Sequence, residues 1–204
     1  MLEFLAAAAI QLPQGNYSTA RSLQRRLPEV SEAGDATVAE VRLFVGPDGR
    51  VKECTIERAI GSDTVAQDFC KAAVGVKMTP ARDERSKKAF GLAFPVLSAF
   101  PNGKKALMGR LSEKLTENPL LADFRVILQA MPRTVRENPR VSLKVRVDET
   151  GSVVICQPSD EKRKSIAQMA CDQSRAHSFE ALKTQEGTPV SYLRRVSVEF
   201  VSEE

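Results

Sequence analysis

The chain has 204 residues, of which 42% are hydrophobic and 27% charged, and its formal net charge is +4. This composition is typical of a globular protein and excludes a disordered chain. The 30 basic and 26 acidic residues are interspersed, which argues against a nucleic-acid-binding surface. Four cysteines form two pairs of equivalent spacing, and an even, patterned set favours disulfides in an oxidising compartment.

The first 15 residues, MLEFLAAAAIQLPQG, are mostly apolar. They are too few to span a membrane, which takes about 20 apolar residues, so no stable membrane insertion is expected. A basic segment is missing, yet Ala6–Ala9 would suit a signal cleavage site. Residues 1–15 are therefore either a degenerate signal segment or a short mature N-terminal helix. Further on, Ser22–Leu27 predicts a helical turn before Pro28.

A first set of elements is predicted between residues 39 and 100. Period-two alternation, turn residues and a helix cap predict a strand at 39–45, a turn at 46–49, a strand at 51–57, a helix from Ser62 or Asp63 to about Val74, and a strand at 90–100. Val65, Phe69 and Ala73 form the apolar stripe of this helix. Pro95 cannot donate to a strand ladder, which predicts an edge or a bulge at that position.

The connection at residues 101–138 is predicted to be a helical linker. Leu107, Leu111 and Leu115 recur every four residues and indicate an amphipathic helix ending at Pro119. Residues 120–131 are compatible with a second helix or with an extra strand, and both alternatives stay open.

The elements then recur in the same order. Residues 141–200 predict a strand at 141–147, a turn at 148–151, a strand at 153–157, a helix at about 161–176 and a last strand at 190–200. The apolar face of the helix is predicted to carry Ile166, Met169, Ala170 and Gln173.

The two sets align as an internal repeat. Gly49 and Cys54 correspond to Gly151 and Cys156 at an offset of 102, Cys70 to Cys171 at 101, and Ala81 and Phe100 to Ala181 and Phe200 at 100. An ordered series of matches predicts a duplication, with length changes confined to loops.

The order of these features resembles the TonB C-terminal domain family: a hairpin with a P-D-G or D-x-x-G turn, a helix, a Pro-Ala or Glu-Ala step, a G-x-P-V segment and a strand ending in Phe. The second copy matches G-x-P-V with Gly187, Pro189 and Val190, where the first has Ser86, Lys88 and Ala89. The resemblance implies an α+β fold of two tandem small ββαβ domains, at 28–100 and 139–204. Each would be an antiparallel sheet with one packed helix.

The resemblance also implies a non-enzymatic periplasmic protein-interaction module in TonB-linked envelope transport. Its partner would be an envelope protein or receptor segment, bound by strand addition to an exposed sheet edge. Because Pro95 blocks part of the first copy's last strand, the expected edge is in the second copy, at Val190, Tyr192, Val196, Val198 and Phe200. Two alternatives are a structural envelope protein that self-associates, giving a homodimer, and a cytoplasmic thiol-containing protein or enzyme.

The cysteines are expected to pair within each copy, Cys54 with Cys70 and Cys156 with Cys171. A helix packed on a sheet can bring the two Cβ atoms within the roughly 3.5–4.5 Å that a disulfide requires. Closing a loop of about 15 residues would contribute about 3 kcal/mol. The alternatives are four buried thiols in a cytoplasmic protein, or a metal site shared by the copies.

Catalytic chemistry has little support in the sequence. His177 is the single histidine, so a cysteine nucleophile in the first copy would lack an equivalent base. We therefore expect no enzymatic activity, no cofactor and no metal.

Overall fold

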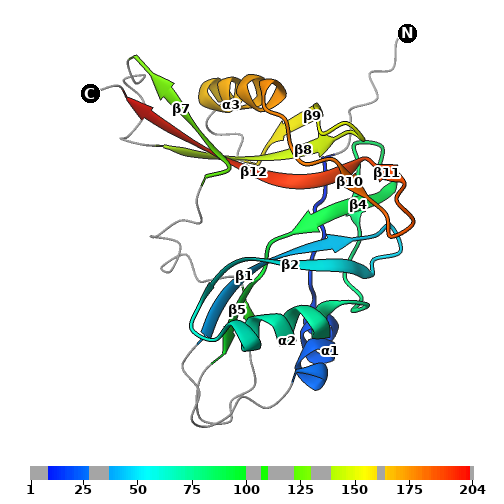
Figure 1. The fold of residues 1–204 in the computed structure, drawn as a ribbon. Helices are drawn as coiled ribbons and strands as arrows, with labels where there is room; N and C mark the ends of the chain where they lie inside the picture. The colour runs from blue at the N-terminus through cyan, green and yellow to red at the C-terminus, as the bar shows by residue number, and fades with distance from the viewer. Residues whose placement is uncertain are drawn as a thin grey trace. The chain divides into compact units, whose positions relative to one another are not determined.

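The computed structural model describes residues 9–27, 37–99, 107–109, 122–129, 139–159 and 164–202. Over these residues the protein is mixed α+β with three helices (Figure 1). Its contacts divide it into two compact units. The N-terminal unit comprises residues 12–82 and 88–117, and the C-terminal unit comprises residues 118–204 with 1–11 and 83–87.

The N-terminal unit is built around strand β1. Its elements are α1 (Tyr17–Arg26), β1 (Thr37–Val45), β2 (Val51–Ile60), α2 (Asp63–Ala73), β3 (Ala81–Arg82), β4 (Lys88–Ala93), β5 (Val96–Ala99) and β6 (Leu107–Gly109). Strand β2 pairs with one side of β1, and β4 and β5 pair in succession with the other. Strand β3 lies beside β4 and β6 beside β5, and every pairing is antiparallel.

Helix α2 supplies much of the core of this unit. Its N-cap is Ser62, one of the two caps that the sequence allows, and the Ser62 hydroxyl accepts from the Val65 N–H. Phe69 and Ala73 are fully buried against the apolar face of β1, whereas Val65 is only half-buried.

Pro95, where the sequence predicted an edge or a bulge, separates β4 from β5. Both strands keep one register along β1, so Pro95 interrupts the ladder without shifting it. The Pro95 carbonyl accepts a hydrogen bond from the Val41 N–H at 3.2 Å, but proline has no N–H to donate in return. A bulge in the β1–β2 pairing lies at the same level, between Glu40 and Val41.

Helix α1 is longer than the helical turn predicted at Ser22–Leu27. The prediction was too short because it did not include the N-terminal cap of the helix. The Asn16 side chain accepts from the Thr19 N–H at 2.9 Å, and the Thr19 hydroxyl accepts from the Asn16 N–H at 3.2 Å. This reciprocal capping starts the helix at Tyr17.

The described part of the N-terminal stretch is not helical. Gln14 and Thr79 exchange two backbone hydrogen bonds, of 3.2 and 2.9 Å, and Ile10 is buried. A helix is therefore wrong for residues 9–15, and residues 1–8 lie outside the described residues.

The C-terminal unit contains a mixed sheet in the order β7-β12-β8-β9. Its elements are β7 (Phe124–Leu128), β8 (Arg140–Val147), β9 (Val153–Pro158), α3 (Lys164–Ala176), β10 (Leu182–Lys183), β11 (Pro189–Val190) and β12 (Tyr192–Ser202). Strand β7 runs parallel to β12, whereas β8 is antiparallel to both β12 and β9. The expectation of a purely antiparallel sheet is therefore wrong here. Strands β10 and β11 form a separate two-stranded hairpin.

Helix α3 buries a face slightly different from the predicted one. Ile166 and Ala170 are buried, but Gln173 is exposed. Ser174 is buried instead, and its hydroxyl donates to the Ala170 carbonyl at 2.7 Å. A serine that bonds within its own helix can face the core without an unsatisfied polar atom.

The linker contains strands where the sequence predicted helix. Leu107–Gly109 is β6, so the leucine periodicity was misleading at these residues. The alternative left open at 120–131 resolves as a strand, β7. The remainder of the predicted helix, at 110–119, lies outside the described residues.

The hairpins that open the two copies have matching registers. Cys54 lies opposite Leu43 and Cys156 opposite Val145. Each hairpin has a bulge just before its turn, between Phe44 and Val45 in one and between Arg146 and Val147 in the other. All of these positions are related by the offset of 102 seen in the sequence.

The second halves of the copies match at an offset of 101. Ala81 pairs with Ala89, and Leu182 with Val190. Likewise, Val45 pairs with Gly91 and Val147 with Tyr192. The offset of 100 predicted from Ala81 and Ala181 is therefore wrong by one residue, because the two short hairpins have equal lengths and need no deletion. The other pair at this offset involves Phe100, which lies outside the described residues.

In each hairpin turn, a glycine accepts a backbone hydrogen bond from the segment that follows the helix. The Gly49 carbonyl accepts from the Met78 N–H at 2.7 Å, and the Gly151 carbonyl from the Phe179 N–H at 2.9 Å. Both glycines have positive φ, 79° and 91°. A Cβ atom would lie 2.4 Å from the Met78 oxygen at Gly49 and 2.1 Å from the Phe179 oxygen at Gly151, so both turns require glycine.

Candidate functional site

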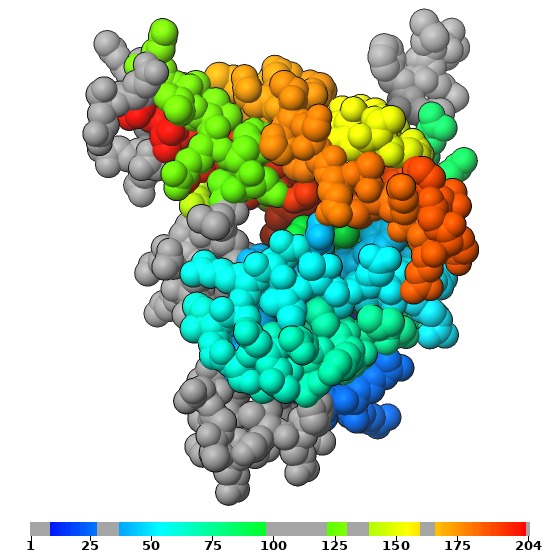
Figure 2. Space-filling view, viewed as in Figure 1, coloured from blue at the N-terminus to red at the C-terminus, as the bar shows by residue number. Residues whose placement is uncertain are grey.

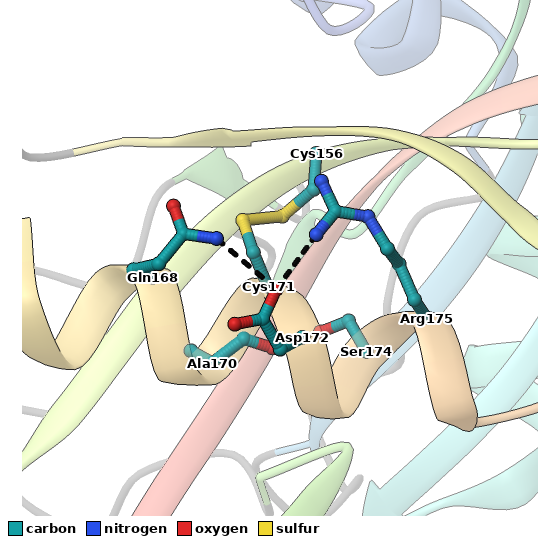
Figure 3. The surroundings of a disulfide bond; sticks show 7 residues. All are labelled: Cys156, Gln168, Ala170, Cys171, Asp172, Ser174 and Arg175. Carbon is teal, nitrogen blue, oxygen red and sulfur yellow. Dashed lines mark hydrogen bonds and ion pairs between the residues drawn. A yellow bond between two sulfur atoms is a disulfide. The ribbon is translucent and has the colours of Figure 1, made fainter.

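One disulfide in each unit ties the second strand of the hairpin to the helix. Cys54 on β2 is bonded to Cys70 on α2, and Cys156 on β9 to Cys171 on α3 (Figure 3). The Cα atoms are 5.2 and 5.7 Å apart, well within disulfide range. Both predicted pairings are confirmed, and no described cysteine is free. Two disulfides indicate an oxidising, extracytoplasmic compartment.

The predicted edge residues lie mostly inside the C-terminal unit. Four of them are on β12 and are at most 1% exposed, namely Tyr192, Val196, Val198 and Phe200. Val190 lies outside β12, on β11, and is half-buried. The four side chains on β12 are part of the core and cannot contact a partner. A partner of β12 would therefore contact the backbone of β12 and the side chains beside it.

Strand β7 covers one side of β12 along its C-terminal half. Phe124 pairs with Val198 and Leu128 with Ser202, in parallel register. That stretch of β12 is therefore not an open edge in this structure, because the linker supplies an additional strand. Among the described residues, no strand pairs with the other side of β7.

Strand β7 lies at the surface of its unit. In the space-filling view its atoms, in green, are visible beside those of α3, in orange (Figure 2). Ile127 is 64% exposed, and the Arg125 side chain is 67% exposed. One face of the strand, carrying Phe124, Val126 and Leu128, is half-buried. Even the more covered face of β7 is only half-buried, whereas the central strand β8 has a fully buried face.

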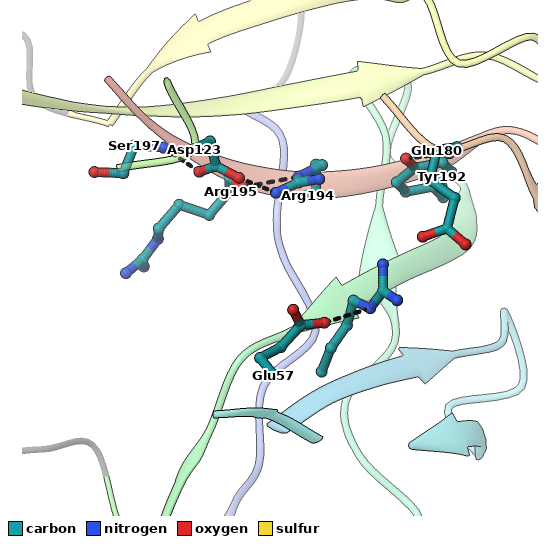
Figure 4. A network of polar contacts seen from close by, with 8 residues as sticks. Glu57, Asp123, Glu180, Tyr192, Arg194, Arg195 and Ser197 are labelled. Atoms are coloured by element: carbon teal, nitrogen blue, oxygen red, sulfur yellow. Dashed lines mark hydrogen bonds and ion pairs between the residues drawn. The ribbon is translucent and has the colours of Figure 1, made fainter. Parts of the chain in front are cut away.

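Asp123 fixes the start of β7 against β12. Its backbone N–H donates to the Ser197 carbonyl at 2.8 Å. Its carboxylate accepts from the Ser197 N–H at 2.7 Å and from the Arg194 guanidinium (Figure 4). Asp123 thus forms hydrogen bonds with both the backbone N–H and the backbone carbonyl of Ser197. Charge-assisted bonds of this kind are about twice as strong as neutral ones.

An aromatic cluster lies next to this contact. The ring of Phe124 stacks on His177 with centroids 4.9 Å apart, and His177 meets Phe179 edge to face at 4.7 Å. The Arg194 guanidinium lies 4.6 Å from the centre of the Phe179 ring. The same arginine therefore contacts both Asp123 and the aromatic cluster, and it joins the polar and aromatic parts of the site.

Glu199 anchors β7 further along. Its carboxylate accepts from Arg125 on β7 at 2.7 Å and from Arg140 on β8 at 2.9 Å. Hydrogen bonding from Arg140 and then from Arg125 lowers the pKa of Glu199 below its ordinary value of 4.5, against the opposing effect of desolvation. Glu199 is therefore ionised at neutral pH and holds three neighbouring strands together.

The N-terminal unit has a counterpart of this arrangement. Strand β6 pairs with β5 over three residues, from Val96 opposite Gly109 to Ser98 opposite Leu107. Strand β5 follows β4 along β1, just as β12 lies along β8. In each unit, a segment of the connection at 101–138 thus adds a strand to the last strand of the repeat.

Sequence reasoning did not single out Asp123, Arg125 or Glu199, and it treated Arg194 only as one half of the basic pair Arg194-Arg195. Its only usable signal was the period-two alternation of Phe124, Val126 and Leu128, which was too short to separate strand from helix. His177, the single histidine of the chain, has a half-buried ring that stacks on Phe124 and meets Phe179 edge to face.

No family model matches the chain, and searches of characterised proteins and of solved structures return no match. Among the described residues, no helix is long and apolar enough to cross a membrane. The same residues contain no group of three or more His, Cys, Asp or Glu side chains that could hold a metal ion.

Proposed function

We propose that this protein is a non-enzymatic, periplasmic protein-interaction module made of two tandem ββαβ domains. Each domain would bind an extended partner segment by strand addition to its last strand. The observation that carries this proposal is that β5 and β12 both accept an additional strand, β6 in antiparallel and β7 in parallel register. An edge that accepts strands in this way offers main-chain hydrogen bonds as its source of affinity.

The tandem arrangement is supported by details that a chance likeness would not share. Both copies have the same hairpin register, the same bulge and a disulfide between the same elements. Both also have a turn glycine of positive φ that receives an N–H from the chain after the helix. These shared details support a duplicated unit, and the resemblance of its sequence features to TonB C-terminal domains extends the proposal to TonB-linked envelope transport.

Self-association is the second candidate function, favoured because no strand in the described part of the chain pairs with the outer side of β7. A strand with one unpaired side can add a second copy of the same chain. A cytoplasmic thiol protein has less support, because all four cysteines are disulfide-bonded.

Site-specific photo-cross-linking in intact cells tests the proposal. A photoreactive phenylalanine analogue replaces Ser202, an exposed residue at the end of β12. The matched control replaces Ser159, an exposed serine just after β9 in the same unit. We expect a discrete adduct with an envelope protein from position 202 and not from position 159. An adduct with a second copy would favour self-association instead. No adduct, or identical adducts from both positions, would contradict partner binding at this edge.

A further inference from the structure

We propose that β7 is an internal ligand of the β12 edge, and that the external partner has the same types of residue as the Asp-Phe-Arg sequence at the start of β7. The partner would be an extended protein segment running parallel to β12, with an acidic, an aromatic and a basic residue in succession. This inference rests on the proposed function, since it identifies the kind of segment that the edge binds.

The first position of the segment is specified as acidic. Asp123 contacts the backbone of Ser197 through its carboxylate and its own N–H, and it also meets the Arg194 guanidinium. An amide or hydroxyl side chain in its place would lose the charge opposite Arg194. This residue sets the register, because it engages β12 one residue before the first pair of the ladder, Phe124 with Val198.

The second and third positions are specified as aromatic and basic. Phe124 stacks on the His177 ring, which Phe179 contacts edge to face. Arg125 points to Glu199, whose side chain is only 13% exposed. A partner without a cation at this position would leave Glu199 with Arg140 alone. Since side chains alternate along a strand, an aromatic residue followed by a basic one meets the two faces of the sheet in the correct order.

Strand β7 has the properties of a ligand that can be exchanged. It is five residues long, it is parallel in an otherwise antiparallel sheet, and two of its five side chains are exposed. Short strands with few buried side chains open more easily than core strands. Because β7 is covalently attached, its effective concentration at the edge is in the millimolar range, and it competes with any external segment.

Peptide binding to the full chain tests this inference. The probe is a fluorescently labelled synthetic peptide with the sequence of residues 122–129, ADFRVILQ. The protein variants are Asp123→Ala and Arg125→Glu, which weaken β7 at its two anchors, and Ile127→Ala, a control at an exposed position of the same strand. Amide hydrogen exchange of β8 and α3 verifies that each variant keeps its fold.

We expect the peptide to bind Asp123→Ala and Arg125→Glu about tenfold or more tightly than the wild-type chain, the effect of losing charged hydrogen bonds. The Ile127→Ala control should resemble the wild type. A peptide with Asn in place of Asp should bind at least about tenfold more weakly to either anchor variant.

Equal affinity for wild-type and anchor variants, or for the native and a scrambled peptide, would overturn the inference. A partner adduct at position 202 combined with such a result would leave the proposed function in place and remove only the internal ligand. Absence of the adduct at position 202, in contrast, would contradict the proposed function itself.

Discussion

Gly151 has a φ of 91°, and a Cβ atom added to it would lie only 2.1 Å from the Phe179 carbonyl oxygen. Replacing it by Ala should therefore cost at least about 3 kcal/mol of unfolding free energy, through backbone strain and a clash that no rotamer relieves. Gly187 is the matched control, since its φ is 82° but nothing lies within 4 Å of an added Cβ. Gly187→Ala should cost about 1 kcal/mol, the conformational penalty alone. Urea denaturation measures both, and equal losses would refute the role assigned to the Phe179 contact.

Glu199 should make stability depend on pH in the acidic range. Its folded-state pKa lies below the ordinary 4.5, mainly because of hydrogen bonds from Arg140 and then Arg125. The stabilisation is therefore complete above pH 4.5 and is lost as the pH falls through the lowered pKa. Glu199→Gln should cost about 1 kcal/mol at pH 7, and the difference from wild type should shrink towards pH 3. Denaturation curves at several pH values measure this difference. A constant difference between pH 7 and pH 3 would show that ionisation of Glu199 is not its source.

Single residues were predictable where local conformation determines them. Gly49 and Gly151 follow from turn chemistry, which requires positive φ whatever the rest of the fold does. Asp123 and Glu199 could not be identified in the same way. Asp123 and its partner Ser197 are 74 residues apart in the sequence, as are Glu199 and its partner Arg125. No local sequence pattern predicts contacts between residues so far apart.

At the scale of elements, each disulfide should stabilise its own helix and hairpin. Replacing Cys156 and Cys171 together by Ser opens a loop of 15 residues and should cost about 3 kcal/mol. Amide exchange should accelerate in β9 and α3 and remain unchanged in β2 and α2. The matched double replacement of Cys54 and Cys70 should show the reverse pattern. Uniform loss of protection after either change would mean that the disulfides do not act within their own units.

The strand elements of the repeat were predicted well because alternation is strong in them. In β8 the buried residues Val141, Leu143, Val145 and Val147 alternate with half-buried polar ones. The linker was predicted poorly because leucines spaced by four residues lie on one face of either a helix or a strand. Leu107–Gly109 is a strand because β5 offers it a partner, which is a tertiary effect that overrides local periodicity.

At the scale of the whole molecule, the repeat was visible in the sequence and its exact alignment was not. The cysteines fixed the offsets of 102 and 101 correctly. The offset of 100 displaced the last strand by one residue, and a shift of one reverses which side chains face the core. The pairing of Tyr192 with Val147, equivalent to Gly91 with Val45, restores the correct alignment.

We infer that the chain consists of two copies of one disulfide-tied unit that act outside the cytoplasm. Mass-spectrometric mapping of the disulfides tests it most directly, after free thiols are alkylated in intact cells. The expected result is no alkylated cysteine and two linked peptide pairs, Cys54 with Cys70 and Cys156 with Cys171. Four alkylated cysteines, or a bond joining a cysteine of one copy to a cysteine of the other, would contradict the claim.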